Sequence, residues 1–277
     1  MGNFLSKQRE NRIRRLSEQR KNERKRFVLD ENTPFNITEA FRKLKASLSV
    51  SVPKREKCGI AVTVTSSYPE DGKTTVSVNL AMMFAMSSNA RVIIVDADIR
   101  KGRVARYFKA KSAPGLSEYL SGQVELNEVI RKSGVNENLD YISCGTHSPK
   151  PFEMLESDGM KELDKILREK YDYIIYDTCP LLLVSDTLAI APMTDGAVVV
   201  CRHMHSYVRD LAKTIHTLKF SKVNVLGVVL NDYKKLGKKV VGYKEYYDDK
   251  YSYGYGSTKG FGSSTLNDEQ DNEESEK

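Results

Sequence analysis

The sequence predicts an α/β fold in which a mostly parallel central sheet carries helices on both faces. Three observations lead to this fold class. Short runs rich in valine and isoleucine recur along the chain, and segments with helical spacing of apolar residues separate them. Strands that are apolar along their whole length are typical of a parallel sheet buried on both faces. Polar residues directly follow several of these runs, at the edge where such sheets bind their ligands.

Six short apolar runs are expected to form the strands, because each is too short for a helix and is rich in β-branched residues. They are Gly59–Thr65, Arg91–Asp96, Leu139–Ser143, Asp172–Asp177, Gly196–Cys201 and Leu226–Asn231.

Helices are expected before and between these strands. The first begins near Asn36, which is expected to cap it, with Glu39 three residues further on. Phe41, Leu44 and Leu48 then share one apolar face. Four further helices are expected at Thr74–Ser87, Gly159–Lys170, Asp186–Pro192 and Tyr207–Phe220.

Composition divides the chain into a basic arm (residues 1–29), a folded domain (residues 30–240) and a flexible tail (residues 241–277). The arm holds ten Lys/Arg and three Glu, and therefore most of the net charge of +7. It is expected to be a solvated extension, with contact to an anionic membrane surface left open and no nucleic acid expected. The tail ends in acidic residues and cannot bury a core. It also carries six of the fifteen tyrosines, namely Tyr243, Tyr246, Tyr247, Tyr251, Tyr253 and Tyr255.

Several protein classes are excluded by the sequence. No run approaches the ~20 apolar residues of a membrane-spanning helix, and the basic N-terminus has no apolar stretch of a secretory signal. A cytoplasmic protein is therefore expected. The four cysteines are far apart in the sequence and are expected to be buried thiols. His203 and His205 could share one face of a strand, but no third metal ligand lies near them.

The segment Ser67–Thr75, with the sequence S-Y-P-E-D-G-K-T-T, directly follows the first predicted strand. A strand that turns into Gly-Lys-Thr at the start of a helix is typical of a phosphate-binding loop. Backbone amides and the Lys73 ammonium face the phosphates of a nucleoside triphosphate, and the Thr74 hydroxyl reaches Mg²⁺. The usual first glycine of this pattern is Ser67 here. The loop predicts a fold like that of P-loop nucleoside triphosphatases, with ATP and Mg²⁺ as its ligands.

Three aspartates follow the ends of two other predicted strands. Asp96 and Asp98 are two residues apart, so both carboxylates point the same way if the strand continues. Asp177 ends the strand Asp172–Asp177. With the Thr74 hydroxyl, these carboxylates are suited to hold a hydrated Mg²⁺.

These motifs together resemble those of the bacterial tyrosine autokinases (BY-kinases) of capsule and exopolysaccharide synthesis. The loop S-x-P-x-x-G-K-T-T, the segment I-V-D-A-D-I-R-K and the segment Y-D-Y-I-I-Y-D-T-C-P are similar to the three Walker-type motifs of that family. Glu39, Arg42 and Lys45 lie in a helix similar to the E-x-x-R-x-x-R helix of ring assembly, and the tail resembles the autophosphorylation cluster. The resemblance covers about residues 35 to 255.

The resemblance implies a role for each matching residue. Asp71, Gly72, Lys73, Thr74 and Thr75 would contact ATP, and Asn231 would contact its base. Thr74, Asp98 and Asp177 would hold Mg²⁺. Lys73, Asp96 and Asp98 would be the catalytic residues, with Asp96 nearest the incoming tyrosine hydroxyl.

The resemblance also implies how the protein works in the cell. The six tail tyrosines would be phosphorylated in a neighbouring subunit's site within a ring-like homo-oligomer. Members without a membrane domain work with a transmembrane adaptor for polysaccharide chain length, so recruitment to the inner face of the membrane is expected. The sequence departs from the family at Glu70, often Gly, at Lys45, usually Arg, and at Cys179, usually Pro.

Two other functions remain open. The first is a P-loop ATPase of the partitioning or septum-positioning type without kinase activity. Those proteins carry a signature lysine five residues before the loop lysine, where this chain has Tyr68. The second is a module that binds nucleotide as a sensor and transfers nothing. Such a module would leave the tail unmodified in Mg-ATP.

Overall fold

The computed structural model describes residues 27–53, 58–87 and 90–233. A seven-stranded sheet forms its centre, in the order β3-β4-β2-β5-β1-β6-β7. Its strands are β1 (Ile60–Ser66), β2 (Val92–Asp96), β3 (Ile130–Lys132), β4 (Leu139–Ile142), β5 (Tyr173–Pro180), β6 (Gly196–Arg202) and β7 (Val225–Asn231). Every strand pairing is parallel except that between β3 and β4.

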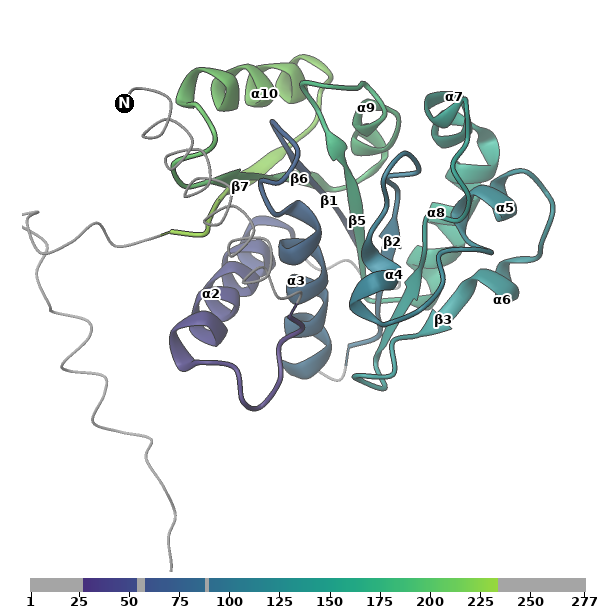
Figure 1. Cartoon of the computed structure of the whole chain (residues 1–277), viewed down its shortest axis with the longest axis horizontal. Helices are drawn as coiled ribbons and strands as arrows, with labels where there is room; N and C mark the ends of the chain where they lie inside the picture. Colours follow the sequence, from purple (N-terminus) through teal and green to yellow (C-terminus); the bar gives the residue numbers. More distant parts are fainter. Residues whose placement is uncertain (1–26, 54–57, 88–89, 234–277) are drawn as a thin grey trace, which may run out of the picture. The chain divides into compact units, whose positions relative to one another are not determined.

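Two layers of helices cover the sheet (Figure 1). On one face lie α2 (Phe35–Ser51), α3 (Lys73–Ser87) and α4 (Val104–Tyr107). On the other lie α8 (Asp158–Lys170), α9 (Thr187–Ile190), the 3₁₀ turn η1 (Ala191–Met193) and α10 (Val208–Phe220). The remaining short helices are α5 (Leu116–Leu120), α6 (Leu126–Val129) and α7 (Pro151–Glu156).

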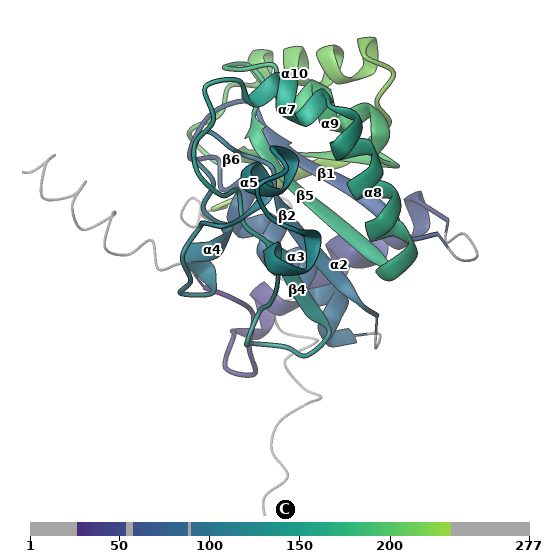
Figure 2. The same cartoon turned by 90° about the vertical axis from the view of Figure 1, so that its right-hand side faces the viewer.

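The core is divided between the two faces because side chains alternate along each strand. Val62 and Val64 of β1 pack with α3 on one face, whereas Ala61 packs with α8 on the other. Figure 2 shows α8 along the face formed by β1 and β5. Because β1, β2 and β5 are buried along almost their whole length, their register is strongly fixed. This register places the ends of the three strands side by side.

The predicted strands and long helices are all present, with ends that move by one to three residues. The prediction of Asn36 as a helix cap is wrong, because α2 begins at Phe35 after Pro34. The chain turns at Asp30–Thr33, and the fixed φ of Pro34 already directs it into the helix. The expected apolar face is correct: Leu48 is buried, and Phe41 and Leu44 pack against the core.

Three other local expectations differ from the structure. The expected helix Asp186–Pro192 is α9 followed by η1, because Pro192 cannot continue an α-helical hydrogen-bond ladder. His203 and His205 do not share a strand face, since β6 ends at Arg202. Cys144, Cys179 and Cys201 are buried as expected, but Cys58 is only half-buried.

Among the helices of the described residues, none is both long and apolar enough to cross a membrane. The basic arm, apart from its last residues, and the tyrosine cluster lie outside the described residues.

Candidate active site

The phosphate-binding loop joins β1 to α3. Gly72 has φ +93°, and a Cβ at this position would collide with the side-chain amide of Asn231. Glycine is therefore required at residue 72 by both its backbone conformation and its close neighbour. The backbone of Lys73 begins α3, so the helix N-terminus faces the space above the loop, where phosphates bind in such folds.

Asp71 supports the loop from below. Its carboxylate is fully buried and accepts hydrogen bonds from the Tyr68 backbone at 3.1 Å, from Ser206 Oγ at 2.7 Å and from His205 Nδ1 at 2.9 Å. These bonds hold the loop to the segment that follows β6. The sequence alone suggested that Asp71 contacts ATP, but the structure directs its side chain to this internal network.

Three more side chains at the loop contact the protein itself. Asn231, at the end of β7, donates from Nδ2 to the Asp71 carbonyl oxygen at 2.9 Å. It therefore supports the loop backbone. The Thr75 hydroxyl is 2.7 Å from the Tyr107 hydroxyl. Ser67, at the usual glycine position, forms a 2.8 Å hydroxyl contact with Thr214 of α10.

Lys73 and the three aspartates converge at the carboxyl ends of the strands. Asp96 of β2 lies opposite Asp177 of β5 in the sheet register. Lys73 Nζ donates to Asp98 Oδ2 at 3.0 Å. Ser77, one turn further along α3, donates from Oγ to Asp177 Oδ1 at 3.0 Å. The Thr74 hydroxyl also interacts with Asp177, where its hydrogen bond partly offsets the rise that burial causes in the pKa of that carboxyl.

The charges of this cluster shift one another's protonation. Burial would lower the pKa of Lys73, but the nearby carboxylates of Asp177, Asp98 and Asp96 outweigh it, so its pKa is raised. Lys73 is therefore a fixed positive charge at neutral pH. Burial, and then the charge of Asp177, raise the pKa of Asp96 well above its ordinary value. Burial also raises the pKa of Asp177, against the opposing effect of Lys73.

The oxygens of this cluster fit a magnesium–nucleotide complex. Asp96 Oδ1 and Asp177 Oδ2 are buried and have no hydrogen-bond partner among the described residues. Buried carboxylate oxygens normally have partners, so two orphans beside the loop indicate a missing ligand. Within the described part of the chain, no three acidic, histidine or cysteine side chains form a metal site by themselves. Mg²⁺ typically needs only one or two protein carboxylates, with phosphate oxygens and water completing its octahedron.

Asp96 is positioned through its second oxygen. Oδ2 accepts from the Val104 amide at 2.9 Å, and the Gly102 backbone covers it so closely that a Cβ there would collide with it. Oδ1 is the oxygen without a partner. The carboxylate is thus held in one orientation, with a single oxygen available to a reacting group.

Sequence reasoning missed the residues that position the predicted ones. Ser77 lies four residues after Lys73, so the helical period indicates that it faces the same side. His205 and Ser206 carry no comparable signal, because 135 residues separate Ser206 from Asp71. Only the parallel pairing of β1 with β6 in the sheet brings Asp71 close to His205 and Ser206.

The predicted assembly residues lie on α2. Arg42 and Glu39 form an ion pair on the exposed side of the helix. Lys45 faces inward, with Nζ 5.9 Å from the centroid of the Phe84 ring, and burial lowers its pKa. Glu39 and Arg42 are therefore accessible to another subunit, whereas Lys45 lies against α3 of its own chain.

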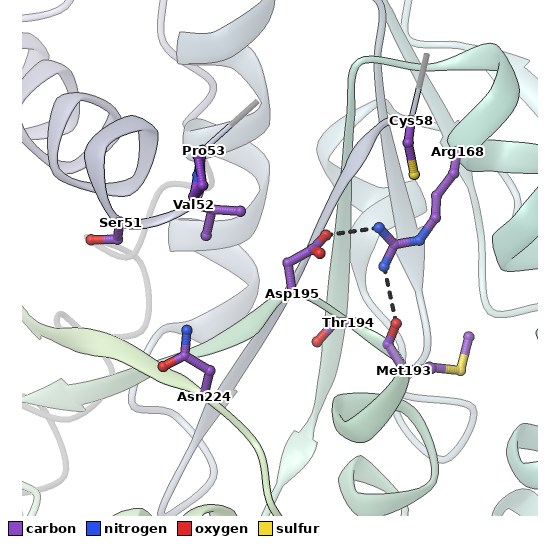
Figure 3. Close-up of a pocket in the computed structure, with 9 residues that line it drawn as sticks. All are labelled: Ser51, Val52, Pro53, Cys58, Arg168, Met193, Thr194, Asp195 and Asn224. Atoms are coloured by element: carbon purple, nitrogen blue, oxygen red, sulfur yellow. Dashed lines mark hydrogen bonds and ion pairs between the residues drawn. The ribbon is translucent and has the colours of Figure 1, made fainter. Parts of the chain in front are cut away.

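A cavity of about 530 Å³ lies at the opposite edge of the sheet, near the amino ends of β1, β6 and β7. Figure 3 shows Arg168 beside it, donating to Asp195 and to the Met193 carbonyl. Arg168 is saturated by partners within the protein, which also include Asp164 and the Gly59 carbonyl. This cavity is separate from the loop and the aspartates, and its charged groups stabilise the fold.

Comparisons with known proteins agree with this geometry. A family model described as an AAA domain matches residues 70–226. The tyrosine-protein kinase YwqD of Bacillus subtilis (strain 168) is 31% identical over 210 residues, which cover 76% of this chain and 84% of that protein. The tyrosine-protein kinase ptk of Acinetobacter johnsonii is 37% identical over 174 residues, which cover 63% of this chain. This chain spans only about a quarter of the length of ptk, since the match covers 24% of it.

Solved structures give the same result. The kinase domain of Escherichia coli tyrosine kinase ETK has a TM-score of 0.69 and 31% identity, over 80% of this chain and 89% of that chain. The cell division ATPase MinD of Pyrococcus furiosus has a TM-score of 0.54 and 25% identity, over 63% of this chain and 71% of that chain. The predicted P-loop NTPase-like α/β fold is thus confirmed, and this chain belongs to the bacterial tyrosine-protein kinase family.

Proposed function

We propose that this protein is an ATP-dependent tyrosine autokinase that phosphorylates its own C-terminal cluster, Tyr243, Tyr246, Tyr247, Tyr251, Tyr253 and Tyr255. The observation that carries the proposal is the convergence of Lys73, Asp96, Asp98 and Asp177 around two buried carboxylate oxygens without partners. The tyrosine-rich sequence behind such a site supplies a phosphate acceptor on the same chain.

The chain's own residues would act mainly by positioning and charge. The α3 N-terminus, Gly72 and Thr75 would bind the triphosphate, and Lys73 would exchange Asp98 for phosphate oxygens. Thr74, Asp98 and Asp177 would hold Mg²⁺, partly through water, once Lys73 has left Asp98. Bound Mg²⁺ would supply neutralisation of the charge on the transferred phosphoryl group. Asp71 and Asn231 would keep the loop backbone in its binding conformation.

Asp96 would receive the tyrosine proton. A phenol has a pKa near ~10 and arrives protonated at neutral pH. The unpartnered Oδ1 of Asp96 offers an acceptor whose orientation the Val104 amide already holds. Because phosphoryl transfer needs little early deprotonation, Asp96 would act late in the reaction.

A tethered acceptor does not need a tight binding site. A short flexible tether gives an effective concentration of about millimolar. We infer that subunits assemble into a ring through Glu39 and Arg42, with Lys45 setting the packing of α2, and that each tail reaches a neighbour's site.

We also infer that a transmembrane polysaccharide adaptor recruits the protein to the inner face of the membrane, in capsule or exopolysaccharide synthesis. A relative from Klebsiella pneumoniae described as a kinase in the cps region, 32% identical over 222 residues, supports this setting.

The test is incubation of the purified full chain with Mg-ATP, alongside the Lys73→Met and Asp98→Asn variants, followed by phosphosite mapping by mass spectrometry. Label on Tyr243–Tyr255 in the wild type and its loss in both variants is the expected result. Circular dichroism of the variants separates a lost site from a lost fold. If no label appears, the assay is repeated with cytosolic peptides of candidate adaptors.

An ATPase of the partitioning type is the second candidate, because MinD shares the fold. Tyr68 stands where that group carries its signature lysine, and its hydroxyl donates to Asp210 of α10 at 2.8 Å. It is therefore bound to its own chain and is no charge equivalent of lysine. ATP hydrolysis without any tail label would favour this candidate over the kinase.

A further inference from the structure

A second cavity, of about 410 Å³, lies at the carboxyl ends of β2 and β4. We call it the basic pocket, because Lys101, Arg103, Arg106 and His147 line it. Gly102 and Cys144 are also among its lining residues. No acidic side chain lines it.

The basic pocket adjoins Asp96. Gly102 lies directly over Asp96 Oδ2 and Cys144 Sγ, so that a Cβ on Gly102 would collide with both. Val104, between the two arginines, donates its amide to the same Asp96 oxygen at 2.9 Å. A group in the pocket is therefore separated from the proposed proton acceptor by about one residue of backbone.

Three exposed cations of the basic pocket are not used in ion pairs within the described part of the chain. The side chains of Lys101, Arg103 and Arg106 are exposed and form no ion pair with any carboxylate in the described residues. The neighbouring Arg100 behaves differently, because it is held by Asp186 in a two-point contact at 2.6 and 3.1 Å. Arg100 is thus used within the fold, whereas the pocket presents three unpaired cations next to the site of transfer.

The sequence places three acidic residues next to two potential acceptors, between two flanking lysines, Lys244 and Lys250. Glu245, Asp248 and Asp249 flank the adjacent Tyr246 and Tyr247. In an extended peptide, neighbouring residues are ~3.3 Å apart along the chain, so side chains one to three positions from an acceptor lie within ~10 Å of it. That reach matches a pocket that shares its floor with Asp96.

We propose that the basic pocket binds an anionic side chain beside the acceptor tyrosine, and so selects acidic peptides as substrates. This proposal rests on the proposed kinase function of the same site. In the unmodified tail the anion is a carboxylate. Once a neighbouring tyrosine is phosphorylated, the phosphotyrosine offers the same chemistry with more charge, and arginine binds both groups through two parallel hydrogen bonds. Phosphorylation of one tyrosine would then promote phosphorylation of the next.

The test compares peptides of residues 243–255 on the full chain. One peptide has the natural acids, a second has Glu245→Gln, Asp248→Asn and Asp249→Asn, and a third carries phosphotyrosine at Tyr246. Binding is measured by fluorescence anisotropy in Mg-ADP, and transfer by the initial rate in Mg-ATP. The readout is the ratio of acidic to neutral peptide, because the protein's own tail competes with both alike.

Arg103→Gln/Arg106→Gln is expected to reduce this ratio about ten-fold in both assays, as two contacts of partly exposed charges would. The control variant Arg209→Gln/Lys219→Gln removes two exposed charges from α10 and should leave the ratio unchanged. Arg103→Glu/Arg106→Glu should prefer a peptide with lysines at the three acidic positions. The phosphopeptide should bind the wild type more tightly than the acidic peptide does. The Arg103→Gln/Arg106→Gln variant should also reduce the affinity for the phosphopeptide by a larger factor.

Two results would overturn the proposal. One is that the wild type binds and phosphorylates the acidic and neutral peptides equally well. The other is that the Arg103→Gln/Arg106→Gln variant loses affinity and rate by the same factor for both peptides. A failure of the kinase function looks different. In that case no peptide is phosphorylated, yet the acidic peptide still binds in a way that depends on Arg103 and Arg106. If both peptides are phosphorylated without preference, the proposed kinase function stands and the proposed role of the basic pocket is wrong.

Discussion

Individual residues of the phosphate-binding loop show how local backbone strain and buried hydrogen bonds shape the site. Glu70 has φ +66°, a conformation that favours glycine, while Asp71 is buried beneath the loop and bound by three donors. The Asp71 carboxylate is directed inward, where it accepts hydrogen bonds from His205 and Ser206.

At this scale, Glu70→Gly is expected to stabilise the protein by about 1 kcal/mol, because a side chain in the left-handed region costs roughly that amount. Urea unfolding of the full chain measures the change. Lys222→Gly, at φ +59° after α10, should give a similar gain. Glu162→Gly, inside α8, should instead destabilise the protein by about 1 kcal/mol. A loss of stability in Glu70→Gly would show that the Glu70 side chain contributes more than its backbone costs.

A pH effect is expected from Glu118. Burial raises the pKa of Glu118, but hydrogen bonds from Thr146 and Gly115 outweigh it, so its folded pKa lies below the usual value. The unfolded side chain titrates near ~4.3, so the stabilisation is present above that pH and is lost as the pH falls through the folded pKa. Glu118→Gln should cost about 1–3 kcal/mol at pH 7 and much less once the pH has fallen below the folded pKa of Glu118. Unfolding free energies of both proteins across this range test it, and a pH-independent difference would contradict it.

At the scale of elements, the connections between them depend on a few buried charges. Arg168 near the end of α8 binds Asp164 of the same helix, Asp195 before β6, and carbonyls of Gly59 and Met193. One guanidinium thus joins a helix to the amino ends of two strands. Because each donor has its own acceptor, the shape of arginine is required as well as its charge.

Arg168→Lys is therefore expected to destabilise the protein by about 2–4 kcal/mol, since lysine cannot replace the several directed bonds and leaves a buried carboxylate with fewer partners. Thermal unfolding measures this. Nucleotide affinity at a temperature where the variant is folded should stay unchanged, because the loop lies at the opposite edge of the sheet. Arg209→Lys on α10 is the matched control, with an expected change below about 0.5 kcal/mol. A selective loss of nucleotide binding would mean that the two edges are coupled.

The whole molecule has a charge balance that phosphorylation would reverse. The net charge is +7, and each phosphotyrosine adds roughly −1.5 to −2. Six phosphotyrosines would therefore bring the chain to about −2 to −5. Arg42 and Glu39 form an ion pair on the exposed side of α2, where we propose that a neighbouring subunit binds.

Full phosphorylation is expected to weaken self-association, because the added negative charges repel one another within an assembly. Sedimentation velocity of unmodified and fully phosphorylated protein at matched salt measures the effect, which should decrease as salt is raised. A chain with all six tail tyrosines changed to phenylalanine, incubated with Mg-ATP, controls for nucleotide binding. Identical profiles of the two forms would contradict the expectation.

The sequence by itself determined the sheet, its long helices and the position of the nucleotide loop. Fully apolar strands can be buried only in a parallel sheet with two covered faces, and the carboxyl ends of such strands must share an edge. The sequence alone therefore predicted that four side chains lie close together, namely Lys73, Asp96, Asp98 and Asp177. Short elements such as β3 and α4 could not be predicted, because three or four residues carry too little periodicity.

Only the tertiary structure decided which way the loop's side chains face. Asp71 turns inward because His205 and Ser206 follow β6, a neighbour of β1 that lies far away in the sequence. The tertiary structure likewise placed Arg103 and Arg106 at a pocket that adjoins Asp96, and it placed Lys45 over the Phe84 ring. Sequence patterns report burial and period within an element, whereas partners across elements depend on strand order, and strand order is set by packing of the whole sheet.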